Sequence, residues 1–553
     1  MSLDLVYERL TQKRVVSENS SESVVEGTVT LPDRAHEIGR ALKLRATPRL
    51  GKIDVKEGRV VFEGSFDLSL LYAYADPSAA EALTHEEYDE DEHDYRQGAA
   101  VAGERLEAVS WHDELPFAYV LELPGVAEGE ALETAVQVTS TSFDVRSDRV
   151  TLDVDIGVVF SARRTEIVPF AAAKGVRGAQ GVDVERRTVR LVSYLGQGRT
   201  AAEARGRLPL NGRAAPERIL EARPVPVVTE AAAGDGSARV QGYLNYAVLY
   251  SGAGGSPQYA EWSRGAAFQV EVEIPSATRG ALCHVEVRPK ATDCRTFEDD
   301  DGSRWLDVRT PLEVEVRVEE IKEVTVITGL EAKDKEVASR RETLRVLEAV
   351  GEAQKIEEAA GTLDLPEGMP AIERVLFGTA TAGVDDVHVL GDKVAVELHV
   401  DAELFYVARG QAEGAVHVAQ WARALEFDLE IPLRGAEPGL ERHVDVEVLD
   451  VAFELINRES VEAQVRVAAE VALSREVEMD VVAEAVEVPP PEANPPTYTY
   501  VVVRPQDTIW KLAARYRSHP EIIVAANSWL ESEESPLIPG RKVCVPRKGA
   551  RAG

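Results

Sequence analysis

A long internal repeat constrains this chain more than any other feature. A Trp lies six residues before a Phe three times, in Trp111–Phe117, Trp262–Phe268 and Trp421–Phe427. Successive copies are about 150 residues apart, which is the size of a domain and well above the period of a solenoid repeat. The chain is therefore expected to contain three similar domains rather than one.

Other motifs recur in the same order around each Trp. Strand-like runs end in an apolar residue and Tyr at Tyr72, Tyr250 and Tyr406. Upstream of each strand-like run, a Gly leads into a Leu-Pro step, at Leu31-Pro32, Leu208-Pro209 and Leu365-Pro366. Downstream of each Phe, an apolar residue is followed by Pro, at Leu123-Pro124, Ile274-Pro275 and Ile431-Pro432. Because isolated aromatics at equivalent sites usually fill a core, the three Trp side chains are expected to be packing residues.

Period-two alternation of apolar and polar residues predicts that the repeats are β. Residues 312–318 read Leu-Glu-Val-Glu-Val-Arg-Val, which is typical of a strand with one wet face. Few helical stretches intervene to make parallel crossovers, so the prediction is a mainly β chain of three tandem antiparallel sandwich or barrel-like domains. Residues 340–360 favour helix by composition and are expected to form one mixed segment.

Composition shifts divide the chain further. The predicted units are 1–175, 176–330 and 331–488, and the first carries an acidic insertion at 76–105 that is expected to be a solvated loop rather than a cation site. A Pro-rich linker at 489–496 precedes a small module at 497–546 and a basic tail at 547–553.

Charge and motif content exclude several classes of function. A formal net charge of −34 argues against a nucleic-acid partner, and three Cys residues indicate a reducing compartment rather than a disulfide framework. Neither a signal peptide nor a transmembrane segment is expected, so the chain is expected to stay in the cytosol.

Phosphate-loop, nucleophile-elbow and zinc-protease motifs are missing, and Cys283, His284 and Cys294 make too few ligands for zinc. No enzyme activity, cofactor or metal is predicted.

The last 50 residues predict a compact module with the order strand, helix, helix, strand. Residues 500–503 read as the first strand, and Asp507 is a candidate N-cap of the helix that follows. Pro520 suits the first position of the second helix, and Val543 with Val545 predicts the closing strand. The module is therefore expected to be a small α+β domain.

This module resembles the LysM domain, from Tyr500-Val-Val through Asp507-Thr-Ile-Trp to Pro539-Gly and Val545-Pro546. Gln506 stands where the family usually has Gly, so a loop that normally tolerates positive φ carries a side chain. The resemblance implies a ligand groove between two loops, formed by Gln506, Asp507, Thr508, Ile509, Asn527, Trp529, Leu530, Ile538 and Pro539. The alternative is that Ile509, Trp510 and Ile538 are simply the core of a small domain.

The repeat itself resembles the SPOCS domain of spore coat assembly proteins, which are often paired with a C-terminal LysM module. The resemblance implies a non-enzymatic scaffold at the forespore surface, in the mother-cell cytoplasm. It also implies that the module docks a spore coat morphogenetic protein, the basement-layer ATPase, or a glycan. The alternative is a cell-wall protein whose module binds peptidoglycan or a chitin-like polymer of N-acetylglucosamine.

The charge of the C-terminal region favours a protein ligand over a neutral glycan. Residues 497–553 contain nine Lys or Arg and five acids, whereas the rest of the chain is strongly acidic. We therefore expect an acidic partner, with Asp507 and Thr508 setting the groove and an attractive field from Lys511, Arg515, Arg541 and Lys542. The alternative is that these charges only offset acidic neighbours.

Overall fold

A computed structural model describes residues 3–75, 103–177, 181–252, 255–299, 302–332, 335–409, 415–490 and 496–547. The mainly β prediction is confirmed, and a small α+β region follows the sheets. The predicted acidic insertion lies outside the described residues except for 103–105. Most of the predicted linker and of the basic tail also lies outside them.

The strands form three successive units. Unit one contains β1 (Asp4–Thr30), β2 (Arg40–Lys56), β3 (Arg59–Ala75), β4 (Glu104–Glu122), β5 (Glu133–Val145) and β6 (Thr151–Arg177). Unit two contains β7 (Val182–Pro209), β8 (Arg218–Ala233), β9 (Ser237–Ser251), β10 (Pro257–Glu273), β11 (Leu282–Pro289), β12 (Asp293–Glu298) and β13 (Arg304–Ala332). Unit three contains β14 (Glu336–Asp364), β15 (Ile372–Leu390), β16 (Lys393–Ala408), β17 (Val416–Pro432), β18 (Glu441–Asn457) and β19 (Ser460–Val488).

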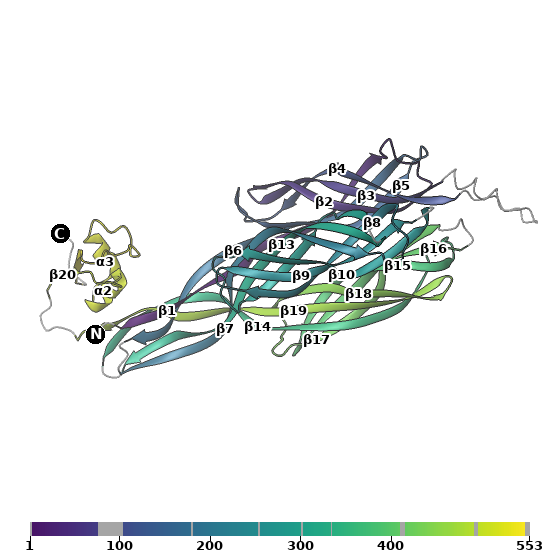
Figure 1. Cartoon of the computed structure of the whole chain (residues 1–553). Helices are drawn as coiled ribbons and strands as arrows, with labels where there is room; N and C mark the ends of the chain where they lie inside the picture. Colours follow the sequence, from purple (N-terminus) through teal and green to yellow (C-terminus); the bar gives the residue numbers. More distant parts are fainter. Residues whose placement is uncertain are drawn as a thin grey trace, which may run out of the picture.

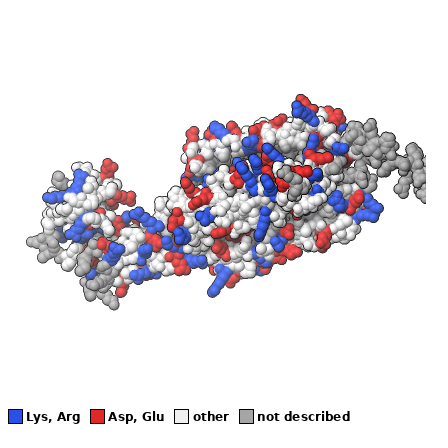
Figure 2. All heavy atoms as spheres, viewed as in Figure 1, with Lys and Arg blue, Asp and Glu red and all other residues white. Residues whose placement is uncertain are grey.

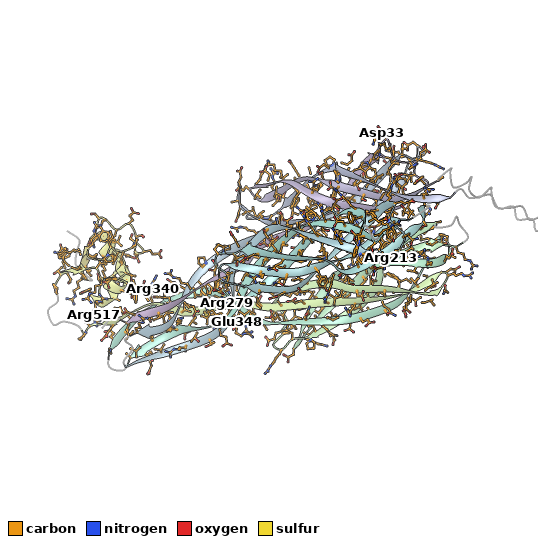
Figure 3. The ribbon with its side chains drawn as sticks, in the orientation of Figure 1. Asp33, Arg213, Arg279, Arg340, Glu348 and Arg517 are labelled. Atoms are coloured by element: carbon orange, nitrogen blue, oxygen red, sulfur yellow. The ribbon has the colours of Figure 1, made fainter. Side chains whose placement is uncertain are left out.

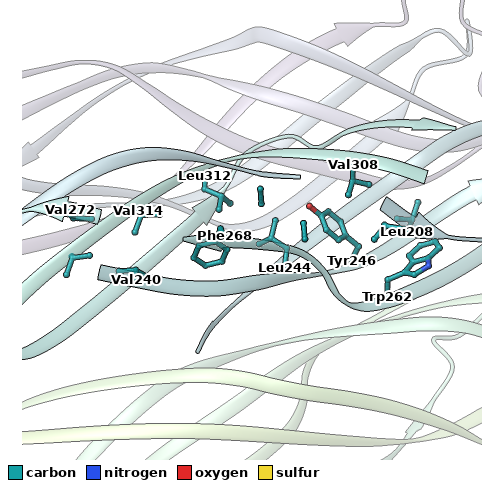
Figure 4. Close-up of a cluster of buried hydrophobic side chains, with 14 of the residues drawn as sticks. Leu208, Val240, Leu244, Tyr246, Trp262, Phe268, Val272, Val308, Leu312 and Val314 are labelled. Carbon is teal, nitrogen blue, oxygen red and sulfur yellow. The ribbon is translucent and has the colours of Figure 1, made fainter. Parts of the chain in front are cut away.

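Each unit is a sandwich of two antiparallel sheets. In unit one the sheet orders are β1-β6-β5 and β2-β3-β4, and unit three repeats them as β14-β19-β18 and β15-β16-β17. In unit two β13 pairs with β7, β11 and β12, and β8-β9-β10 forms the facing layer. Single pairs, Ala267↔Arg205 between β10 and β7 and Glu348↔Leu191 between β14 and β7, join both layers and β14-β19-β18 of unit three into one ten-stranded sheet. The alternating apolar residues meet between the sheets, as Figure 4 shows for Leu244, Tyr246 and Val314 of unit two.

The three Trp residues occupy the same place in each unit. Every indole N–H donates to the backbone oxygen of the last residue of the unit's first strand: Trp111 to Thr30 at 2.8 Å, Trp262 to Pro209 at 2.9 Å and Trp421 to Asp364 at 2.7 Å. Burial of Trp111 and Trp262, at 7% and 8% exposed, confirms the packing prediction for these two. Trp421 is half-buried and packs against the core of unit three.

Backbone hydrogen bonds correct two of the predicted equivalences. Leu210, rather than Leu208, follows the Trp-bonded carbonyl of unit two and is the equivalent of Leu31. In unit three the Leu433 amide donates to the Asp392 carbonyl in the turn before β16, as the Leu123 amide of unit one donates to the Gly58 carbonyl in the turn before β3. Leu433, rather than Ile431, is therefore the equivalent of Leu123. Both predicted positions were wrong by two residues because a period-two strand offers a similar apolar residue at every second place.

The helix expected at 340–360 is wrong, because these residues lie within β14. This strand pairs with β19 from Glu336↔Val488 to Asp364↔Ser460. The Glu, Ala and Arg content favours helix only by tenths of a kcal/mol per residue, roughly, and pairing along the whole strand outweighs that preference.

The first and last strands of each unit are much longer than a sandwich needs. A β-bulge divides each pair, between Val15 and Ser17 in unit one, between Val318 and Glu319 in unit two and between Ala349 and Gly351 in unit three. Beyond the bulges the six strands leave the sandwiches and pack together, as the narrow end in Figure 1 shows. We call this part the stalk; it comprises 4–15, 165–177, 182–194, 319–332, 336–349 and 474–488.

The sandwiches also contact one another around the molecule. Strand β4 lies beside β8, β10 beside β15, and β17 beside β2, so each unit touches the next and the third returns to the first. A shared apolar cluster includes Leu71 of unit one, Leu249 of unit two and Phe405 of unit three. Lysine and arginine side chains alternate with acids over the visible face of this body (Figure 2).

Candidate ligand-binding site

The C-terminal module lies at the free end of the stalk (Figure 1). Its elements are β20 (Tyr498–Val502), α2 (Ile509–Arg515), α3 (Pro520–Ala525) and β21 (Lys542–Pro546), which confirms the predicted order. The two strands pair antiparallel, and Ile509, Leu512 and Ile523 of the helices pack on Val543 and its neighbours. Pro520 begins α3, as predicted.

The first groove loop connects β20 to α2. Gln506 is exposed and has a φ of 70°, so the left-handed conformation expected from the family pattern is present although the residue is not Gly. Asp507 is not the N-cap. Its carboxylate accepts from the Arg504 amide at 2.8 Å and from Arg515 at 3.1 Å, whereas the Thr508 hydroxyl accepts from the Lys511 amide and caps α2.

The second groove loop is tied to the first through backbone hydrogen bonds. The amide of Val503, just after β20, donates to the Arg541 carbonyl, and the amide of Gly540 donates to the Val503 carbonyl, both at 2.9 Å. Asn527 links the end of α3 to β21, because its side chain donates to the Ile523 and Cys544 carbonyls and accepts from the Cys544 amide at 2.9 Å. The two predicted loops therefore lie side by side.

The predicted groove residues separate into buried supports and accessible groups. Ile509, Asn527 and Leu530 are buried at 1%, 7% and 6% exposed, and the Asp507 side chain is 5% exposed. Five residues remain accessible at the surface: Gln506, Thr508, Trp529, Ile538 and Pro539. A ligand can therefore contact only this second set without rearrangement of the module.

The four predicted steering cations differ in their surroundings. Arg515 is half-buried and paired with Asp507, and Lys511 donates to the Gln506 carbonyl at 3.0 Å. Arg541 is exposed and stacks 3.9 Å above the Trp529 ring, and Lys542 is exposed on β21. The stacking of Arg541 on Trp529 could not be foreseen, because the two residues belong to different segments with no pattern joining them.

Chemically, the groove offers apolar and hydrogen-bonding surface rather than a reaction centre. Ile538, Pro539 and Trp529 supply apolar faces, and Gln506 and Thr508 supply polar groups. Within the described part of the chain, no cluster of three or more His, Cys, Asp or Glu side chains could hold a metal ion. In the same residues no helix is long and apolar enough to cross a membrane.

Comparison with known families assigns two kinds of domain. The model of the SipL, SPOCS domain matches residues 37–146 and 371–456, and the model of the LysM domain matches 501–546. No curated protein and no solved structure matches the chain. Both domain types are non-catalytic binding domains, and together they indicate a spore-associated protein with a glycan-binding module. The chain thus contains SPOCS domain sequence in its β region and ends in a LysM domain.

Proposed function

We propose that the chain is a non-enzymatic scaffold of spore coat assembly. Its three β units would form the support, and the LysM module would bind a coat partner protein or a glycan. The observation that carries this proposal is the closure of the three units into one body with the module at the end of their shared stalk. Such a body holds a binding module away from the bulk of the protein, which suits tethering better than catalysis.

We also propose that unit two is a SPOCS domain, so that the chain divides into domains at about 175 and 330. The matched segments cover β2 to β5 of unit one and β15 to β18 of unit three. Unit two has the same Trp hydrogen bond and the same β8-β9-β10 sheet in the corresponding place. The six long strands that form the stalk lie outside both matched segments.

For the module, the exposed cations support an acidic protein partner. Arg541 and Lys542 remain accessible, whereas Asp507 neutralises Arg515, so the first two would supply most of the attraction. This attraction acts over a screening length of about 8 Å at physiological salt. The exposed apolar groups Ile538 and Pro539 favour the second candidate, a polymer of N-acetylglucosamine, because the apolar faces of sugars pack on such surfaces.

Localisation tests the proposed function directly. A fluorescent fusion of the full chain in sporulating cells is expected to form a ring around the forespore, on its mother-cell side. A uniform outline of the vegetative cell wall would instead support the wall-binding alternative.

A pull-down tests the ligand. The full chain and a chain ending at residue 490 are incubated with sporulating-cell extract and with purified peptidoglycan, at low and high salt. We expect the full chain alone to retain a protein partner, and to lose it at high salt. Tight, salt-insensitive retention on peptidoglycan without a captured protein would overturn the acidic-partner proposal.

A further inference from the structure

The module makes specific contacts with the end of the stalk. The Thr508 hydroxyl donates to the Glu484 carboxylate of β19 at 2.7 Å. Arg517 donates to the Glu336 carboxylate of β14 at 2.5 Å and to the Pro489 carbonyl at 3.2 Å. Two acids from neighbouring strands thus meet one hydroxyl and one guanidinium of the module, and Figure 3 shows Arg517 at this junction.

Glu484 is held in position for this contact. Its side chain is 12% exposed, and Arg340 of the adjacent strand lies 3.4 Å from the carboxylate. Glu336 is more open, with a side chain 60% exposed. The hydrogen bonds that join hydroxyl and guanidinium to carboxylate are charge-assisted and therefore stronger than neutral ones.

The contact with Glu484 occupies a hydrogen-bond donor of the groove, the Thr508 hydroxyl. Thr508 is one of the accessible groove residues, and a hydroxyl has a single proton to donate. The Glu484 carboxylate accepts this one hydrogen bond, and the Lys511 amide donates to the same hydroxyl oxygen. A ligand that needs the Thr508 donor must therefore displace Glu484.

We infer that Thr508 and Arg517 form a binding surface for an acidic protein segment, and that the chain's own stalk end occupies it. The inference rests on the proposed function and names the partner chemistry of the same module. Opposite charge favours the docked state, because residues 497–553 carry an excess of four positive charges while the rest of the chain is strongly acidic. The stalk end is joined covalently to the module through 489–496, so it competes for this surface at a high effective concentration. An acidic partner binds when it displaces Glu484 and Glu336.

The test weakens the docking without changing the module. The full chain carrying Glu336→Lys and Glu484→Ala is compared with wild type and with a control carrying Glu478→Lys and Glu476→Ala. The control makes the same charge change at exposed positions of the stalk strand β19. Small-angle X-ray scattering reports docking, and fluorescence anisotropy reports binding of a labelled twelve-residue polyglutamate peptide.

We expect the docking variant to have a larger radius of gyration and to bind the peptide at least about tenfold more tightly than both other proteins. Binding should weaken as salt is raised, and adding Arg517→Glu should remove the gain over wild type. An unchanged radius of gyration, or equal peptide binding by all three proteins, would overturn the inference. The inference would also be overturned if the docking variant gained affinity for an N-acetylglucosamine hexamer but not for the peptide. That result would support the glycan form of the proposed function.

Discussion

At the scale of single residues, a strained bulge explains the spacing between Trp and Phe. The second residue after each Trp has a left-handed backbone although it is not Gly: Asp113 has a φ of 55°, Arg264 of 56° and Arg423 of 53°. In each unit the strand register shifts at this point. The amide of the strained residue donates to an Asp or Asn side chain on the preceding strand, with which the bulged strand pairs, at Asp67, Asn245 and Asp401. A side-chain acceptor thus holds each bulge.

Replacing the acceptor in unit two tests this explanation. The Arg264 amide donates to Asn245 Oδ1 at 2.9 Å. We expect Asn245→Ala to lower the free energy of unfolding by about 1 kcal/mol, since a typical hydrogen bond contributes that much. Asn245→Asp keeps an acceptor, as units one and three do, and should stay near wild type. Chemical denaturation measures both; equal stability of Asn245→Ala and wild type would disprove the role of the acceptor.

At the scale of elements, the stalk strands depend on one buried polar residue. Gln12 of β1 is 1% exposed and donates to the carbonyls of Val192 in β7 and Leu347 in β14, at 3.3 Å and 2.9 Å. Its side-chain oxygen accepts from the Leu347 amide at 3.1 Å. One amide therefore joins strands from all three units at the point where their stalk parts converge.

Removing this amide should loosen the stalk. We expect Gln12→Ala to lower the free energy of unfolding by about 2–3 kcal/mol, because it leaves buried backbone groups of Leu347 and Val192 without this partner. Hydrogen exchange should rise at stalk amides of all three units. Gln354→Ala, at an exposed position of β14, is the control and should change stability by less than about 0.5 kcal/mol. Exchange that rises in β1 alone would contradict the three-unit junction.

At the scale of the whole molecule, a buried carboxylate joins units one and two. Glu107 is 5% exposed, accepts from the Tyr72 hydroxyl at 2.7 Å and pairs with Arg218 of unit two at 2.6 Å. Burial by itself would raise the pKa of Glu107, but hydrogen bonds from Tyr72, His36 and Arg218 outweigh it and hold the pKa below its usual value. The ionised form therefore stabilises the junction.

This shift predicts how the stability of the junction depends on pH. A carboxyl group whose pKa is lower in the folded state contributes stability above its unfolded pKa of about 4.5, and loses it as pH falls through the folded value. We expect Glu107→Gln to cost about 2 kcal/mol at pH 7, with the difference from wild type shrinking below about pH 4.5. Glu114→Gln, at an exposed site, is the control. A deficit that stays constant down to pH 3 would refute the role of the charge.

Sequence patterns could predict the class of the fold and the order of elements in the module. Alternation such as that of residues 312–318 specifies a half-buried strand, and Pro520 and Asp507-Thr508 locate helix starts within one residue. The same local information could not separate Leu208 from Leu210, or Asp507 from Thr508 as the cap. These choices depend on which hydrogen-bond partner lies nearby in space.

The sequence by itself determined the β units, their threefold recurrence and the small LysM domain, because periodicity and motif spacing act over short stretches of chain. Only the tertiary structure decided the closure of the units, the shared stalk and the contact of Thr508 with Glu484. It also decided that β14 is a strand, through pairing with β19 from Asp364↔Ser460 to Glu336↔Val488, which are 96 and 152 residues apart in the sequence. The physical reason is that such contacts join residues far apart in the sequence, and their free energy depends on packing and charge that no local pattern records.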